Sequence, residues 1–251
     1  IMQIVAQLAM EQPVAFTDAD VRVEKIKALR SLRLYTPSEA AANFVRGQYD
    51  AGDGTNAYRH EDGVDPESGT ETFVAAKLMF DNYRWSGVPF YVRTGKKLAD
   101  KFTRIDVVFK KPLIDIFANP RSESDQSLNS NVLTIFVEPN SGFAIQLNAK
   151  HAGQGFTTEP VDLRFLQSDS DKKESPEPYE RLFHDALEGN HTNFASWAEI
   201  AYAWKFVDVI RKLWDIEKPQ FPNYTPGSMG PAASDELLAR DGRKWVYRLN
   251  H

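Results

Sequence analysis

The chain has 251 residues, no cysteine and a formal net charge of −5, with 42% hydrophobic and 26% charged residues. This composition is typical of a globular protein with one large core or two modest ones. The absence of cysteine excludes disulfides and thiolate metal sites, and the acidic balance provides no basic footprint for nucleic acid. The lack of cysteine also fits a cytoplasmic protein. No apolar run approaches the roughly 20 residues that a membrane-spanning helix needs.

The first ten residues have the pattern of one buried helical face. Apolar side chains stand at Ile1, Ile4, Val5 and Leu8, the spacing of an amphipathic helix. No capping Ser, Thr, Asp or Asn precedes this pattern, although a helix normally begins with one. We therefore expect the chain to be part of a longer protein.

A second helix is predicted to start at Thr17. This residue fits the N-cap position, and Asp18 and Asp20 lie in the first turn, where the helix dipole favours acidic side chains. Further on, residues 44–49 alternate like a strand. The segment 50–69 is rich in Gly, Asp and Asn, which predicts a long surface loop.

The middle of the chain has the alternating pattern of β-strands. The turn 139–142, which contains Pro, Asn, Ser and Gly, joins two of them into a hairpin. The Ser-rich segment 119–131 and the charged segment 168–178 are predicted to be loops. The strands are expected at 70–80, 90–92, 103–110, 132–137, 143–147 and 161–166.

The last third of the sequence changes to helical periodicity, over 179–187 and 197–214. Large apolar residues in the second of these helices predict a core-facing stripe. Prolines from Pro219 onward predict an extended tail. The stripe comprises Trp197, Ile200, Tyr202, Trp204, Val207 and Leu213.

This order of elements predicts the fold class. Consecutive strands followed by helices indicate an α+β fold, with a large mixed, mainly antiparallel sheet and helices packed on one face. The other face of such a sheet has to be covered, and self-association is the usual way to do so. We therefore expect a homo-oligomer that forms through the sheet face.

One stretch, residues 84–101, combines a strand with a cluster of cations. The apolar run 90–92 is followed by Arg93, Lys96, Lys97 and Lys101. A mobile ammonium on a loop anchored by a buried strand suits the binding of sugar hydroxyls and phosphates. The alternative interpretation is that these are ordinary solvated lysines.

Complete catalytic motifs are missing from the sequence. There is no G-x-G-x-x-G dinucleotide fingerprint, P-loop, H-E-x-x-H pair or nucleophile elbow. His184 and Asp185 are neighbours in a helical segment, where neither is aimed at the other. We therefore predict no catalytic, coenzyme-binding or metal-ligating residue in this chain.

The segment RWSGVPFYVRTGKKL at 84–98 resembles the strand and loop that precede the sugar-phosphate pocket of glucose-6-phosphate dehydrogenases. Five further blocks agree with this family in the same order, so the chain is identified as a member, of bacterial type. The blocks are MEQPVAFTDADVRVEKIKALRSL at 10–32, RGQYDAG at 46–52, TETFVAAKLMF at 70–80, PYERLFHDALEGN at 178–190 and GPAASDELL at 230–238.

The resemblance covers only the C-terminal domain of that enzyme. It implies a full-length parent that oxidises glucose 6-phosphate to 6-phosphogluconolactone with hydride transfer to NADP, the first step of the pentose phosphate pathway. The catalytic His and the NADP-binding domain belong upstream of the residues that match 1–4, so this chain alone is expected to be inactive. Lys96 and Lys101 match the two cations of the family's glucose 6-phosphate pocket.

Two departures from the family pattern stand out. Glu138 replaces a Gln whose amide meets the sugar in many members, which puts that contact in doubt. Some members hold a second, structural NADP on basic residues. Arg93 matches one of these, but Phe102, Asp106 and Phe136 stand where cations are needed, and we expect this site to be missing.

Two other interpretations of the resemblance stay open. The chain could be a non-catalytic assembly or regulatory protein built on this domain. It could also belong to a different sugar oxidoreductase whose substrate domain shares the fold.

Overall fold

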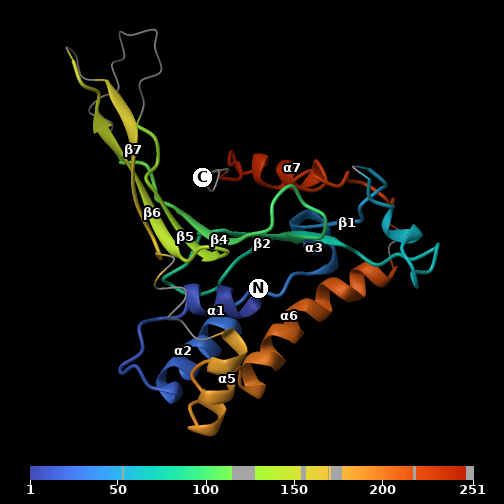
Figure 1. The fold of residues 1–251 in the computed structure, drawn as a ribbon, viewed down its shortest axis with the longest axis horizontal. Helices are drawn as coiled ribbons and strands as arrows, with labels where there is room; N and C mark the ends of the chain where they lie inside the picture. Colours follow the sequence, from blue (N-terminus) through green and yellow to red (C-terminus); the bar gives the residue numbers. More distant parts are fainter. Residues whose placement is uncertain are drawn as a thin grey trace. The chain divides into compact units, whose positions relative to one another are not determined.

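The computed structural model describes residues 1–52, 54–114, 128–153, 157–168, 170, 177–216 and 219–246. The described part is built of helices and antiparallel sheets, which confirms the α+β class (Figure 1). The chain divides into two compact units, one formed by 1–99 and 177–251 and the other by 100–176. Each unit is considered by itself below.

The helices of the first unit start where the sequence provides caps. The Thr17 hydroxyl accepts a hydrogen bond from the Asp20 amide at 3.2 Å, as predicted for the second helix. Thr36 and Glu39 form a capping box before a short helix that the sequence analysis missed. The helices are α1 (Met2–Ala9), α2 (Asp18–Arg30), α3 (Pro37–Asn43), the short 3₁₀ helix η1 (Tyr58–His60), α5 (Pro178–Leu187), α6 (Trp197–Ile216) and α7 (Ala233–Ala239).

A three-stranded antiparallel sheet lies at the centre of the first unit. Its strands are β1 (Phe44–Gly47), β2 (Phe73–Leu78) and β3 (Phe90–Gly95), with β2 in the middle. Both faces of β2 are buried. Ala76 and Leu78 pack in one cluster with residues of α1, α2 and α6, whereas Phe73 and Ala75 pack in another with residues of α7. This double burial explains why β2 has an apolar run rather than an alternating pattern.

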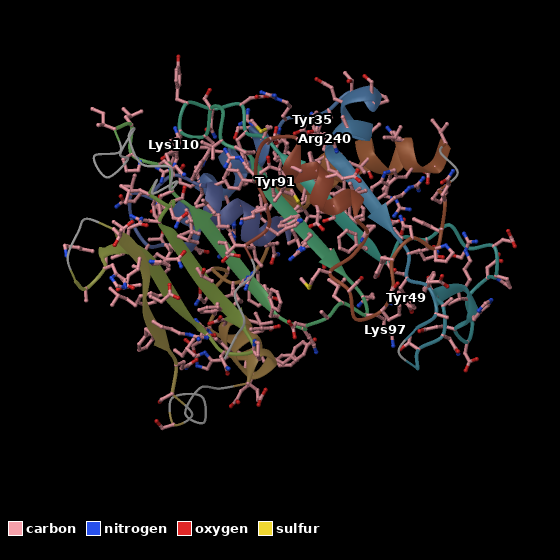
Figure 2. All side chains as sticks on the ribbon, turned by 90° about the horizontal axis from the view of Figure 1, so that it is seen from above. Tyr35, Tyr49, Tyr91, Lys97, Lys110 and Arg240 are labelled. Atoms are coloured by element: carbon pink, nitrogen blue, oxygen red, sulfur yellow. The ribbon has the colours of Figure 1, made fainter. Side chains whose placement is uncertain are left out.

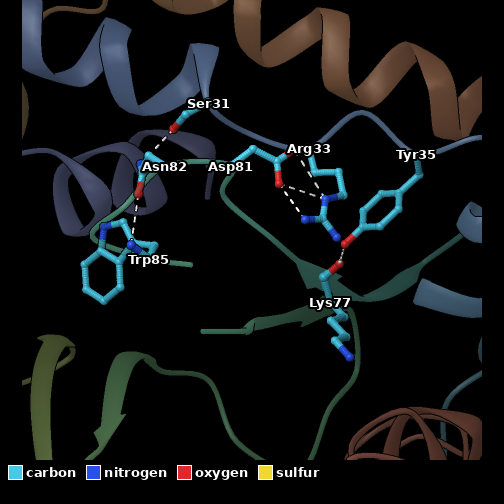
Figure 3. A network of polar contacts seen from close by, with 7 residues as sticks. All are labelled: Ser31, Arg33, Tyr35, Lys77, Asp81, Asn82 and Trp85. Carbon is cyan, nitrogen blue, oxygen red and sulfur yellow. Dashed lines mark hydrogen bonds and ion pairs between the residues drawn. The ribbon is translucent and has the colours of Figure 1, made fainter. Parts of the chain in front are cut away.

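Polar contacts fasten the connection between α2 and α3 to the segment after β2 (Figure 3). Two nitrogens of the Arg33 guanidinium donate to one carboxylate oxygen of Asp81, at 2.5 and 3.0 Å. The Tyr35 hydroxyl donates to the Lys77 carbonyl at 2.9 Å, and burial raises the pKa of Tyr35 to about 12. Asn82 links Ser31 to the amide of Trp85. These bonds fix the chain just before it enters β3.

The second unit is a four-stranded antiparallel sheet. Its strands, in spatial order, are β4 (Thr103–Val108), β5 (Val132–Glu138), β6 (Gly142–Lys150) and β7 (Thr158–Leu166). β5 and β6 form the predicted hairpin. The register places Phe143 opposite Phe165 and Leu147 opposite Val161, so that these apolar side chains share one face of the sheet.

The structure confirms one part of the predicted stripe of α6, since Val207 and Leu213 pack against the core, and corrects another. Trp197 and Trp204 are 82% and 54% exposed, and Ile200 is also exposed, so these residues are not core. The helix instead buries Phe206 and Ile210. A neighbouring face of α6 is about as apolar as the buried one. Helical periodicity alone cannot tell which of the two faces the core.

Two further predictions need correction. The predicted extended tail contains α7, because no proline interrupts 233–239. The predicted single, mixed sheet is, among the described strands, two separate sheets whose ladders are all antiparallel. Of the predicted loops, residues 53, 119–127, 169 and 171–176 lie outside the described residues. None of the described helices is long and apolar enough to cross a membrane.

Candidate functional site

The predicted lysine loop follows directly on β3, which ends at Gly95. Lys96 and Lys97 are both exposed. The Lys96 amide donates to the Thr72 carbonyl at 2.8 Å. Lys97 has a φ of +52°, in the left-handed region that side chains other than glycine rarely adopt. The Lys97 side chain is labelled in Figure 2. The Lys97 carbonyl accepts from the Gly227 amide at 2.9 Å, which helps to hold this conformation.

At two glycines the backbone lies very close to the ring of Phe73. A Cβ atom at Gly95 would lie 2.7 Å from the Phe73 ring, and one at Gly230 would lie 2.3 Å from it. Gly230 also has a φ of +105°, which favours glycine. Because glycine has no side chain, the lysine loop and the segment after α6 can both pack against the buried Phe73 ring.

The segment 223–231, far away in sequence, borders the lysine loop. The Tyr224 hydroxyl donates to the Lys96 carbonyl at 2.8 Å, and the Ala99 amide donates to the Ser228 carbonyl at 2.9 Å. The backbone amide of Asn223 donates to the Gln48 carbonyl, and the backbone amide of Gln48 donates to the side-chain oxygen of Asn223. The sequence analysis missed this support, because the Pro- and Gly-rich composition of the segment indicated only a tail.

Lys101, the second predicted substrate residue, is exposed and belongs to the second unit, whereas Lys96 belongs to the first. The structure therefore does not test whether the two ammonium groups share a cleft, and their convergence stays a prediction. Glu138 ends β5 as an exposed residue opposite Thr103. Its contact with a sugar is likewise untested.

The residues considered for a structural NADP have partners within the chain. The guanidinium carbon of Arg93 lies 4.4 Å from the centre of the Trp245 ring. Asp106 forms a 3.0 Å ion pair with Arg104 and accepts from the Thr134 hydroxyl at 2.7 Å. These contacts lie within the chain, and the absence of a structural NADP site stays a prediction.

Two hollows lie on the described surface of the first unit, and neither is lined by Lys96. One of about 440 Å³ is bordered by Lys97 and by the acidic residues Glu61 and Asp62. The larger hollow, of about 630 Å³, is lined by equal numbers of arginines and carboxylates. One of the arginines is Arg46, whose guanidinium carbon lies 5.3 Å from the centre of the Trp214 ring. Balanced charge in the larger hollow gives it no preference for an anion.

The described residues do not fit a coenzyme domain. All their strand ladders are antiparallel, whereas a dinucleotide-binding fold needs parallel strands joined by crossover helices. In the same part of the chain, no three His, Asp or Glu side chains are grouped as a metal site would require. The Asp185 carboxylate accepts from Asn190 and Asn193 rather than orienting His184.

Comparison with known proteins decides the family. Residues 1–246 match the family model described as "Glucose-6-phosphate dehydrogenase, C-terminal domain". The chain belongs to this family. Two relatives, the glucose-6-phosphate 1-dehydrogenases of Bacillus subtilis (strain 168) and Leuconostoc mesenteroides, are 47% and 45% identical over 249 residues. Each alignment covers 98% of this chain and 50% of the relative, so the chain spans about half the length of these curated relatives.

Solved structures of glucose-6-phosphate dehydrogenases have the same fold. The enzyme from Mycobacterium avium matches with a TM-score of 0.80 at 28% identity, over 99% of this chain and 49% of that one. A second, a glucose-6-phosphate dehydrogenase in complex with its substrate glucose-6-phosphate, matches with a TM-score of 0.79 at 28% identity, over 98% of this chain and 49% of that one. These matches agree with the family assignment and with the α+β architecture.

Proposed function

We propose that this chain is the substrate-binding half of a glucose-6-phosphate dehydrogenase, which oxidises glucose 6-phosphate to 6-phosphogluconolactone with hydride transfer to NADP. The observation that carries the proposal is the lysine loop after β3, with its braced backbone and exposed ammonium groups, in a chain that matches the family over 1–246. A solved relative bound to glucose-6-phosphate supports the same substrate.

In this proposal, Lys96 and Lys101 hold the doubly charged sugar phosphate. Each charge-assisted contact contributes about 1.5–3 kcal/mol when the ammonium meets a phosphate oxygen. A loop with a fixed backbone loses little entropy when its side chain binds, so more of this contact energy is left for affinity.

The remaining chemistry belongs to other residues of the complete enzyme. The group that takes the proton from the sugar and the domain that binds NADP lie outside this chain, which binds and orients the sugar phosphate. We place the enzyme in the cytoplasm, at the first step of the pentose phosphate pathway.

The experiment that tests this proposal replaces Lys96 by Ala in the full-length enzyme. The KM for glucose 6-phosphate should rise about 10- to 100-fold, the equivalent of one charge-assisted contact. The KM for NADP should stay within about twofold, because the coenzyme is bound by another domain. Lys97→Ala is the matched control, since it removes the neighbouring exposed ammonium and leaves Lys96 in place. An equal KM in wild type and Lys96→Ala would remove Lys96 from the pocket.

The substrate assignment has its own test. Reduction of NADP by the full-length enzyme should be at least about 100-fold more efficient with glucose 6-phosphate than with free glucose, because only the phosphate engages two ammonium groups. Comparable efficiency with both sugars would instead support a different sugar oxidoreductase.

We also propose that a second copy of the chain covers the apolar face of the four-stranded sheet. Leu163 and Phe165 on this face are 60% and 56% exposed, and Phe143 lies 5.7 Å from Phe165 between ring centres. A contiguous apolar face of this kind is typical of an oligomer interface. Leu163→Asp should reduce the molar mass measured by light scattering, whereas Leu113→Asp, at an exposed leucine outside the strands, should not. An unchanged mass in Leu163→Asp would exclude this face as the interface.

A further inference from the structure

We propose that Tyr224 is a positioning residue for the substrate, because its hydroxyl fixes the backbone from which the Lys96 side chain extends. This inference rests on the proposed function, in which Lys96 binds the sugar phosphate. Tyr224 does not contact the substrate in this proposal and acts only through Lys96.

The first step is a relay of hydrogen bonds that ends on the lysine loop. The Tyr49 amide donates to the Thr72 hydroxyl oxygen at 3.1 Å, and the hydroxyls of Thr72 and Tyr224 are 2.9 Å apart. The single phenolic hydrogen of Tyr224 has two carbonyl acceptors, Lys96 at 2.8 Å and Thr72 at 3.3 Å. We assign it to the shorter bond, to Lys96. The Thr72 hydroxyl then donates to Tyr224, and the three bonds run in one direction toward Lys96.

The second step is that Tyr224 is itself rigid. Its side chain is 5% exposed, and its ring lies 5.7 Å from the Phe73 ring and 6.3 Å from the Tyr49 ring, between centres. Burial raises the pKa of Tyr224, so the hydroxyl stays protonated and keeps its donor role at neutral pH. A donor held by packing on two aromatic neighbours can fix its acceptor in place.

The third step is that the loop backbone is braced on both sides of Lys96. The Lys96 amide bonds Thr72, and the carbonyls of Lys96 and Lys97 bond Tyr224 and Gly227. Lys97 in the left-handed region would relax without such bonds. Loss of the Tyr224 hydroxyl frees the peptide between Lys96 and Lys97 to rotate, and the ammonium then samples a wider volume.

The experiment compares Tyr224→Phe with wild type in the full-length enzyme. Phenylalanine keeps the buried ring and removes only the hydroxyl. The KM for glucose 6-phosphate should rise about three- to tenfold, the equivalent of about one hydrogen bond. The kcat and the KM for NADP should stay within about twofold, because Lys96 binds the ground state and the transition state alike.

Tyr49→Phe is the matched control. Tyr49 belongs to the same aromatic cluster and is 3% exposed, but its hydroxyl donates to the Glu61 carboxylate at 2.7 Å and not to the backbone of the lysine loop. This variant should lower the melting temperature about as much as Tyr224→Phe and leave the KM for glucose 6-phosphate unchanged. A purely structural role of Tyr224 would give the two variants the same kinetics.

A second pair of variants tests the relay without touching Tyr224. Thr72→Val keeps the shape of the side chain and removes its hydroxyl, so the KM for glucose 6-phosphate should rise about twofold or more. Thr72→Ser keeps the hydroxyl and should stay near wild type. This pair decides the question if Tyr224→Phe does not fold.

The outcomes separate this inference from the proposed function. An effect of Lys96→Ala on the KM, together with none of Tyr224→Phe, would overturn the positioning role and leave Lys96 in the pocket. No effect of Lys96→Ala would overturn both. Equal rises in KM for Tyr224→Phe and Tyr49→Phe would assign the effect to general loosening of the cluster and would also overturn the inference.

Discussion

The two sheets of this chain are built from similar strands but differ in what covers them. β2, in the three-stranded sheet, is buried on both faces by helices and loops of its own unit. β7, in the four-stranded sheet, exposes large apolar side chains such as Leu163 and Phe165. Apolar side chains thus stabilise the fold in the first sheet, whereas in the second they are available for another surface.

The largest effect on stability is expected when a phenylalanine buried in the first unit is compared with one exposed on the second sheet. Phe80→Ala removes a fully buried ring that packs on Phe90 at 4.8 Å, and should lower the free energy of unfolding by about 3–5 kcal/mol. Phe165→Ala, on the exposed sheet face, should cost less than about 1 kcal/mol in the dissociated protein. Urea denaturation followed by tryptophan fluorescence measures both. Similar costs would mean that the second sheet is covered within its own unit.

A buried ion pair in the first unit gives the next effect. Lys25 and Glu199 join α2 to α6 at 2.7 Å, and Glu199 is 4% exposed. Glu199→Gln leaves the Lys25 ammonium buried without its counter-charge, which should cost about 3 kcal/mol. Arg22→Ala, which breaks the more exposed pair with Asp18 on the same helix, should cost less than about 0.5 kcal/mol. An equally small cost of Glu199→Gln would show that water reaches the pair.

The same pair predicts a pH dependence. Burial raises the pKa of Glu199, but the hydrogen bonds from Lys25 and Ser196 outweigh it and hold the pKa below its usual range. A depressed folded-state pKa contributes stability above the unfolded value of about 4.3, and this contribution is lost as the pH falls through the folded value. The acid side of the stability curve should therefore be less steep in Glu199→Gln than in wild type.

The sequence predicted the lysine loop and most strands because short-range signals define them. Gly87 and Pro89 mark the entry to β3, and the 139–142 turn marks the hairpin. The face of α6 was predicted correctly at Val207 and Leu213 but wrongly at Trp197 and Trp204, which are as apolar as the residues that the helix buries. Tyr224 could not be predicted at all, because it reaches Lys96 across 128 residues and no local pattern encodes such a contact.

A smaller effect is expected at the glycine beneath the lysine loop. Gly230→Ala places a Cβ atom 2.3 Å from the buried Phe73 ring at a φ of +105°, and should cost about 2 kcal/mol or more. Gly63→Ala has a similarly positive φ of +79° but no neighbour within 4 Å, so only the backbone cost of about 1 kcal/mol remains. Equal melting temperatures of the two variants would show that Phe73 can move aside, and that the loop is less tightly packed than its hydrogen bonds suggest.

The smallest effect is expected at the surface of the same unit, where charge rather than packing makes the contact. Arg33 donates two hydrogen bonds to one carboxylate oxygen of Asp81, but both side chains are about half exposed. Arg33→Ala should cost about 0.5 kcal/mol, and the cost should shrink in 0.5 M salt, because water and ions screen an exposed pair. The Tyr35 and Asn82 hydrogen bonds still fasten the same connection in this variant (Figure 3). A loss above about 1.5 kcal/mol that salt does not reduce would mean that the Arg33 pair, and not the buried ring of Tyr35, holds this connection to the three-stranded sheet.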